Sequence, residues 1–269
     1  SARLYFVRLD PRCASEGNAM NPSLVDILSP RIKPLDLDNR LLLIREFIPG
    51  RIIFTTSFGI EDQLITHSIF TQALDIEIAT IDTGRLFPET YELWERTEAR
   101  YAHRIPAVYA QTTPLERLIA QQGVNGFYKS LDARKACCAI RKVEPLKRLL
   151  DGASAWVTGL RADQSQSRAE TTFVAYDTGH KIIKINPLID YTRDQIVAQT
   201  QEFAIPVNTL HDKGFLSIGC APCTRAVAPN ESERAGRWWW EQDDKKECGL
   251  HIDAEGRISR APIEPESSL

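Results

Sequence analysis

The sequence RIIFTTSFGIED, residues 51–62, decides the fold. Its first half, residues 51–56, is rich in β-branched side chains and predicts a short strand. Ser57, Phe58 and Gly59 follow as a turn. Apolar residues then recur at the spacing of a helix, at Ile60, Leu64, Ile65, Ile69 and Phe70. The stretch therefore predicts a strand, a tight turn and a helix, which together begin a βαβ unit.

The same alternation continues along the chain. Further strands are predicted at residues 76–81, 107–110, 155–158 and 181–185. Further helices are predicted at residues 88–104, 113–122, 137–150 and 192–203. Strands that alternate with helices of ten or more residues are typical of an α/β fold, with a mostly parallel sheet and helices on both faces.

Glycines follow three of the predicted strands, at Gly59, Gly84 and Gly159. Open α/β sheets bind ligands beyond the carboxyl ends of their strands. We therefore expect a ligand site where these three turns meet.

Composition limits the class of protein. The 269 residues are 43% hydrophobic and 26% charged, which suffices to bury the core of one large domain. A net charge of -3 argues against a broad electrostatic grip on nucleic acid, so an anionic ligand needs a local cluster of cations. No apolar run approaches the roughly 20 residues that cross a bilayer, and we expect a cytoplasmic protein without a membrane partner.

Three segments are expected. Residues 1–22 include the only methionine, Met20, and are interpreted as an N-terminal extension outside the core. Residues 23–230 contain no repeats and form the main domain. Residues 231–269 change in composition to a tryptophan run, a charged run and a polar tail, and are interpreted as a mobile C-terminal arm.

The six cysteines are few and clustered, unlike the disulfide framework of a small secreted protein. Four of them form two pairs, Cys137-Cys138 and Cys220-Ala221-Pro222-Cys223, the number of thiolates that an iron-sulfur cluster or a zinc ion takes. Adjacent cysteines converge poorly on one tetrahedral ion, whereas a cluster offers separate iron corners. A zinc site, unrelated buried thiols and a redox pair remain alternatives.

The remaining cysteines differ in context. Cys248 lies after Lys245 and Lys246 and near His251, and cations nearby favour a reactive thiolate. The alternative is a free surface thiol. Cys13 has no such context and is assigned no role.

The vicinal cysteine pair, the later C-x-x-C and the terminal Cys-Gly-Leu-His resemble the thioredoxin-dependent adenylyl-sulfate reductases, iron-sulfur members of the adenylyl-sulfate and phosphoadenylyl-sulfate reductase family. The resemblance covers residues 42–251. It implies an adenine nucleotide alpha hydrolase-like (ATP pyrophosphatase-like) fold. It also implies one four-iron four-sulfur (4Fe-4S) cluster on Cys137, Cys138, Cys220 and Cys223, and members without the cluster mostly use the 3′-phosphorylated substrate.

The resemblance also implies substrate-binding residues. The turn of Ser57, Phe58 and Gly59 resembles a nucleotide-binding loop at a helix N-terminus, which attracts anions, although such turns also serve only as helix caps. Phe58 stands where ATP-cleaving relatives carry a glycine, which disfavours pyrophosphate. The other substrate residues that the resemblance implies are Asp82, Thr83, Gly84, Arg141, Lys142, Gly159, Arg161, Arg168, Arg234, Arg237 and His251.

The activity implied is attack of the Cys248 thiolate on the sulfur of adenosine 5′-phosphosulfate (adenylyl sulfate), which releases AMP and leaves an S-sulfocysteine. Reduced thioredoxin then releases sulfite. No thioredoxin-like domain follows residue 269, so we expect thioredoxin as a separate protein, and the oligomeric state stays open. The alternatives are a 3′-phosphoadenylyl-sulfate reductase, an ATP-dependent adenylating or tRNA-thiolating enzyme of the same fold, and a non-enzymatic metal-binding module.

Overall fold

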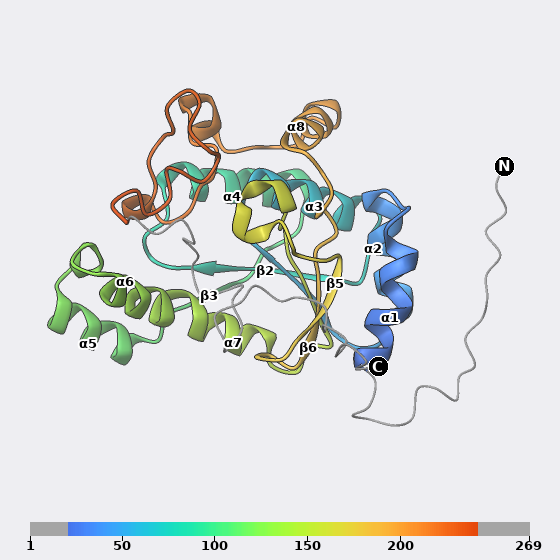
Figure 1. Ribbon diagram of the computed structural model, residues 1–269, viewed down its shortest axis with the longest axis horizontal. Helices are drawn as coiled ribbons and strands as arrows, with labels where there is room; N and C mark the ends of the chain where they lie inside the picture. The colour runs from blue at the N-terminus through green and yellow to red at the C-terminus, as the bar shows by residue number, and fades with distance from the viewer. Residues whose placement is uncertain (1–20, 242–269) are drawn as a thin grey trace, which may run out of the picture.

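The computed structural model describes residues 21–241 and is built around one six-stranded sheet (Figure 1). The strands lie in the order β3-β2-β1-β4-β6-β5, and all neighbours are parallel except β5 and β6, which are antiparallel. This confirms the predicted α/β fold. The strands are β1 (Ile52–Thr56), β2 (Glu77–Asp82), β3 (Ala107–Tyr109), β4 (Ala155–Val157), β5 (Val174–Asp177) and β6 (Ile182–Ile185).

Helices cover the sheet, and each strand prediction has its counterpart within two residues. The antiparallel strand β5 and the first two helices were not predicted. Within residues 21–241, no helix is long and apolar enough to cross a membrane. The helices are α1 (Asn21–Ile32), α2 (Leu37–Phe47), α3 (Ile60–Thr71), α4 (Pro88–Tyr101), α5 (Thr112–Gln122), α6 (Leu131–Cys138), α7 (Glu144–Leu150) and α8 (Arg193–Glu202).

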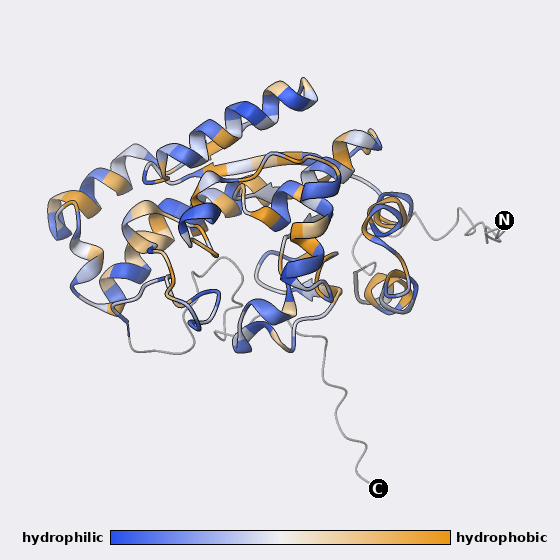
Figure 2. Ribbon diagram, turned by 90° about the horizontal axis from the view of Figure 1, so that it is seen from above, coloured by the Kyte–Doolittle hydropathy of each residue, from blue (hydrophilic) through white to orange (hydrophobic). Residues whose placement is uncertain are grey.

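The sheet is buried on both faces. Successive side chains of a strand point to opposite sides, so neighbouring residues belong to different core clusters. On β1, Ile52 and Phe54 belong to a large core cluster with residues of α1, α2, α3 and α8. Ile53 between them belongs to a second cluster, with Leu146 and Leu150 of α7. Figure 2 shows hydrophobic residues along the strands, with helices of mixed character around them.

The carboxyl ends of β1, β2 and β4 lie side by side. Strand β1 is central, with Thr56 opposite Thr80 of β2 and Phe54 opposite Val157 of β4. The turns that follow these three strands therefore open on the same edge of the sheet, as expected for the glycine turns.

The predicted helix over residues 137–150 differs from the structure. Helix α6 begins earlier, at Leu131, and ends at Cys138. A π-helical segment, Ala139–Val143, then leads into α7, with Pro145 in the first turn of α7. Such widened turns have no periodic signature in the sequence and often occur at functional sites.

Phe58 has an unusual backbone conformation. Its φ of 58° is in the left-handed region, which costs a residue with a side chain about 1–2 kcal/mol. The ring is 1% exposed and stacks on Trp94 at 5.4 Å between centroids. Burial of the ring therefore holds the turn in a conformation that glycine adopts freely.

We predict that Phe58→Ala lowers the free energy of unfolding by about 3–5 kcal/mol, because the ring is lost and the backbone strain stays. Phe58→Gly should cost on the order of 1 kcal/mol less, since glycine relieves that strain, which reverses the usual order of the two residues. Urea denaturation measures both variants. Greater loss in the glycine variant would contradict the strained turn.

Candidate functional site: a cleft beside a four-cysteine cavity

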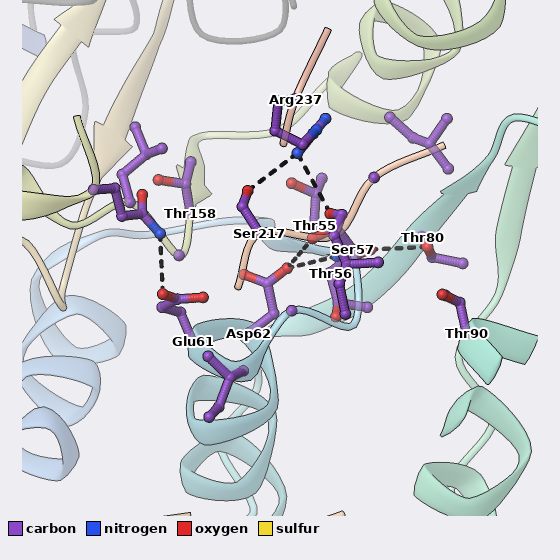
Figure 3. Close-up of a pocket in the computed structure, with 18 of the residues that line it drawn as sticks. Thr55, Thr56, Ser57, Glu61, Asp62, Thr80, Thr90, Thr158, Ser217 and Arg237 are labelled. Atoms are coloured by element: carbon purple, nitrogen blue, oxygen red, sulfur yellow. Dashed lines mark hydrogen bonds between the residues drawn. The ribbon is translucent and has the colours of Figure 1, made fainter. Parts of the chain in front are cut away.

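A cleft opens at the carboxyl ends of β1, β2 and β4, with an empty volume of about 1270 Å³ that includes space open to solvent (Figure 3). The turns after all three strands contribute to its wall. The predicted substrate residues that line it are Ser57, Gly59, Thr83, Lys142, Gly159, Arg168, Arg234 and Arg237.

The turn after β1 is closed by a carboxyl group that sequence reasoning missed. Asp62, in the first turn of α3, accepts the Ser57 backbone N–H at 2.6 Å and the Ser57 hydroxyl at 2.8 Å (Figure 3). Burial raises the pKa of Asp62 to about 7, although the hydrogen bonds from Ser57 act in the opposite direction. The close approach also explains Gly159, where a Cβ would lie 2.1 Å from Asp62 Oδ1.

Phe58 and Arg161, predicted to bind substrate, lie away from the cleft wall. Phe58 points into the core. Arg161 is fully buried, and its guanidinium donates to Glu61 Oε1 at 2.8 Å and to Glu233 Oε2 at 2.6 Å, with a third ion pair to Asp163. Burial lowers the pKa of Arg161, but the charges of Glu61 and Glu233 outweigh it and raise the pKa overall.

The turn after β2 supports the cleft from below. Asp82 is buried and accepts the Gly84 N–H at 2.7 Å and the Tyr91 hydroxyl at 2.9 Å. Arg141 donates to the Thr83 carbonyl at 2.5 Å. Of this group only Thr83 lines the cleft, so Asp82, Gly84 and Arg141 shape the turn from behind.

The cleft carries cations from three parts of the chain. Lys142 comes from the π-helical segment, Arg168 from the loop after β4, and Arg234 and Arg237 from the last described residues. Arg237 donates to the Ser217 hydroxyl at 3.3 Å (Figure 3). These arginine and lysine side chains give the cleft the positive charge that an anionic ligand requires.

Sequence reasoning also missed other cleft residues. His211 and Ser217 line the wall, as does Glu233, whose pKa is raised by burial and by the charge of Glu61. They belong to the irregular chain between α8 and residue 241, which has no periodic pattern.

All four paired cysteines border one second cavity, next to the cleft. Cys137 and Cys138 end α6, and Cys220 and Cys223 flank a short 3₁₀ turn. None of the four forms a disulfide. Lys142 and Cys220 line both cavities and so form the wall between them.

The thiols of this cavity are electrostatically coupled. Burial raises the pKa of Cys223 to about 12, and the charge of Cys220 adds to that effect. Burial also raises the pKa of Cys220, but Lys142, a hydrogen bond with Thr83 and Arg237 outweigh it and lower the pKa overall. A thiolate in this cavity is therefore stabilised from the side of the cleft cations.

Among residues 21–241, no three His, Cys, Asp or Glu side chains are grouped so that they could hold a single metal ion. The four sulfurs instead border one cavity from two separate segments. Trp238, 1% exposed, packs against Cys138. The predicted nucleophile Cys248 and the predicted substrate residue His251 lie outside the described residues.

Comparisons with known proteins agree on one family. The phosphoadenosine phosphosulfate reductase domain family matches residues 51–226. An adenosine 5′-phosphosulfate reductase of Sinorhizobium fredii (strain NBRC 101917 / NGR234) is 53% identical over 235 residues, which are 87% of this chain and 93% of the relative. One from Allochromatium vinosum is 47% identical over 216 residues, 80% of this chain and 82% of the relative.

A solved structure agrees with this assignment. The crystal structure of phosphoadenylyl-sulfate reductase from Candida auris, a phosphate complex, matches with a TM-score of 0.65 and 26% identity. The match covers 79% of this chain and all of that one. Because the family match spans most of the chain and includes the turn after β1, most of the cleft residues and the paired cysteines, this chain belongs to the phosphoadenosine phosphosulfate reductase family and is similar to its adenosine 5′-phosphosulfate reductases.

Proposed function

We propose that this chain reduces adenosine 5′-phosphosulfate to sulfite and AMP in sulfate assimilation, with thioredoxin as the reductant. The observation that carries the proposal is the shared wall of the two cavities, where Lys142 faces both a cationic nucleotide-sized cleft and four cysteines. The names of relatives at about half identity support the activity, an oxidoreductase acting on a sulfur group. Four cysteines that form no disulfide agree with a cytoplasmic location.

The cleft cations bind the phosphosulfate in this proposal. Guanidinium groups suit the oxygens of phosphate and sulfate, and Arg168, Arg234 and Arg237 supply three of them. Lys142 adds a point charge on the side of the cysteines. These cations stabilise the charge that develops on the leaving phosphate when the sulfur is attacked.

The adenosine occupies the rest of the cleft. The wall between the turns of β1, β2 and β4 includes apolar side chains beside backbone groups, as nucleoside pockets do, and Leu86, Leu146 and Leu160 are among them. Thr83 and Gly159 lie on the same wall. The predicted roles of Asp82, Gly84 and Arg141 become indirect in this arrangement, because they hold the turn that carries Thr83.

The cysteine cavity fits a four-iron four-sulfur cluster. Four thiols are the ligand number of such a cluster, and two adjacent cysteines bind separate iron atoms more easily than they converge on one zinc ion. Arg134, Arg141 and Lys142 line the same cavity and compensate the charge of thiolates. We assign the bound cluster an electrostatic and structural role, because the thiol chemistry below balances without it.

Cys248 is the proposed nucleophile. Its thiolate attacks the sulfur of the phosphosulfate, a sulfur–sulfur bond forms, the bond from sulfur to the phosphate oxygen breaks, and AMP leaves with the electron pair. A thiolate of reduced thioredoxin then attacks the Cys248 sulfur, sulfite leaves, and the second thioredoxin thiol resolves the mixed disulfide. Thioredoxin supplies both electrons. His251, three residues after Cys248, is proposed to bind the substrate.

Asp62 separates this proposal from the ATP-dependent alternatives of the same fold. A loop that cradles pyrophosphate offers its amide and hydroxyl donors to the ligand. Here the Ser57 N–H and hydroxyl are already taken by the Asp62 carboxyl. Phe58 also fills the position that a glycine holds in ATP-cleaving relatives. A ligand whose charge is bound by the cleft arginines suits this cleft better.

The second candidate substrate is 3′-phosphoadenylyl sulfate, which the name of the Candida auris protein favours. Comparison of kcat/KM for the two nucleotides with saturating reduced thioredoxin decides between them, and we expect adenylyl sulfate to be preferred. An added phosphate dianion without a paired cation is costly in a partly desolvated pocket.

Cys248→Ser should abolish turnover, and mass spectrometry of wild type given substrate without thioredoxin should show a sulfonate adduct on Cys248. An adduct on Cys13 would refute the nucleophile.

We predict that Cys220→Ser loses the cluster, because serine is a poor ligand for iron and the cavity wall next to the cleft is opened. Iron and sulfide analysis and the visible absorption of anaerobically purified protein measure this. Cys13→Ser is the matched control and should keep full iron content. Stoichiometric zinc in wild type would contradict the cluster.

We predict that Asp62→Asn changes how stability depends on pH. The folded-state pKa of about 7 exceeds the ordinary value of 3.8, so the native protein loses stability as pH rises from about 4 to about 7. Asparagine can accept the same two hydrogen bonds without a charge. Relative to wild type, the variant should therefore gain about 2–3 kcal/mol in free energy of unfolding between pH 5 and pH 8. The exposed Asp26→Asn should show no such trend.

A further inference from the structure

The last described residues, 233–241, run from the cleft to the cysteine cavity, and we name them the clip. Figure 1 shows this red segment on the side toward which β2 points. Its first residue, Glu233, lines the cleft, and Trp238 lines the cysteine cavity. The clip has no regular helix or strand, so side-chain contacts and a few backbone bonds hold it in place.

The first end of the clip is held by charge. Glu233 accepts Arg161 Nη2 at 2.6 Å and Arg193 Nη1 at 3.4 Å. Arg161 is fully buried and Glu233 is 14% exposed, so this pair is little screened by solvent. Arg161 also binds Glu61 at the start of α3, which ties the clip to the turn after β1.

The middle of the clip carries the cleft arginines. Arg234 follows Glu233 directly, and the Arg237 N–H donates to the Arg234 carbonyl at 2.9 Å, which makes one tight turn of both residues. The Arg237 guanidinium lies so close to Gly219 that a Cβ there would be 2.3 Å from it. Arg237 also has supports of its own, because the Arg225 N–H donates to the Gly236 carbonyl at 3.0 Å and the Trp238 N–H donates to the Cys223 carbonyl at 3.1 Å. Arg234 is therefore the arginine that depends most directly on where the backbone at Glu233 is fixed.

The far end is held independently. Arg134 on α6 donates through Nε and Nη2 to the two oxygens of Glu241, both at 2.8 Å, and both side chains are almost fully buried. The guanidinium groups of Arg134 and Arg237 lie over the Trp238 ring at 4.7 and 4.8 Å from its centroid. Loss of the Glu233 contact therefore releases one end of the clip and leaves the other fixed.

We propose that Glu233 is a positioning residue for the nucleotide, which acts by fastening the first end of the clip to Arg161 so that Arg234 faces the phosphate. The inference rests on the proposed function in taking the ligand to be an adenylyl phosphosulfate. Glu233 itself is an anion and does not bind the phosphate. Its effect therefore depends on whether the ligand carries a phosphate.

The test compares two ligands on full-length, cluster-loaded protein: AMP, which keeps the phosphate, and adenosine, which lacks it. In Glu233→Ala we expect AMP to bind about tenfold more weakly or worse, and adenosine to bind as in wild type, measured by calorimetry or ligand-observed NMR. Glu233→Gln, which keeps a hydrogen bond to Arg161 but not the charge, should show a smaller loss for AMP. The glutamine variant also provides the test if Glu233→Ala does not fold.

Glu231→Ala is the matched control, because Glu231 lies two residues earlier, does not line the cleft and pairs with the partly exposed Arg225 at 2.7 Å. It should bind both ligands as wild type does. Unchanged AMP affinity in both Glu233 variants would overturn the proposal. Equal losses for AMP and adenosine would also overturn it, since they indicate general damage to the cleft.

A ligand-free measurement separates this inference from the proposed function. Hydrogen exchange at the amides of residues 234–237 should be faster in Glu233→Ala than in wild type and unchanged in Glu231→Ala. If wild type binds AMP but does not reduce adenylyl sulfate, the proposed function fails and the positioning role still stands. If exchange and AMP binding are both unaffected by the Glu233 variants, the positioning role fails whatever the reaction is.

Discussion

The buried guanidinium of Arg161 is the interaction on which the cleft depends. It lies just after β4 and holds Glu61 at the start of α3 and Glu233 near the end of the described chain, so three segments far apart in sequence meet on one side chain. A buried arginine with one carboxylate removed is left partly uncompensated, which is costly in free energy. The three segments around the cleft are therefore held together by ion pairs on one side chain, and none of them is positioned independently.

The fold could be predicted from the sequence wherever a regular period was present. Strand-like runs such as residues 51–56 alternate with segments whose apolar residues recur at helical spacing. This alternation predicts the parallel strands, and with them a ligand site at the carboxyl ends of those strands. Strand β5 was missed because its antiparallel pairing with β6 depends on tertiary contact, and the π-helical segment after Cys138 was missed because one extra residue in a turn leaves no pattern.

The candidate site was predicted in its parts and not in its connections. Residues that resemble the family motif include those of the cleft and of the cysteine cavity, but Arg161 and Phe58 turned out to support the wall. Asp62 and Glu233 were missed because a carboxylate repels an anionic ligand, so an acidic residue near a predicted phosphate site is not expected to contribute to it. Their role appears only when their partners, Ser57 and Arg161, are seen in space.

The ion pair between Glu241 and Arg134 fixes the last described residue beside α6. Cys248 lies seven positions after Glu241, and a fully extended chain over that distance reaches about 25 Å at most. A thiol tethered within that radius has a local concentration on the order of tens of millimolar. Under the proposed reaction, the chain thus presents the Cys248 thiol to the bound nucleotide at high local concentration. The same thiol must also be reached by thioredoxin.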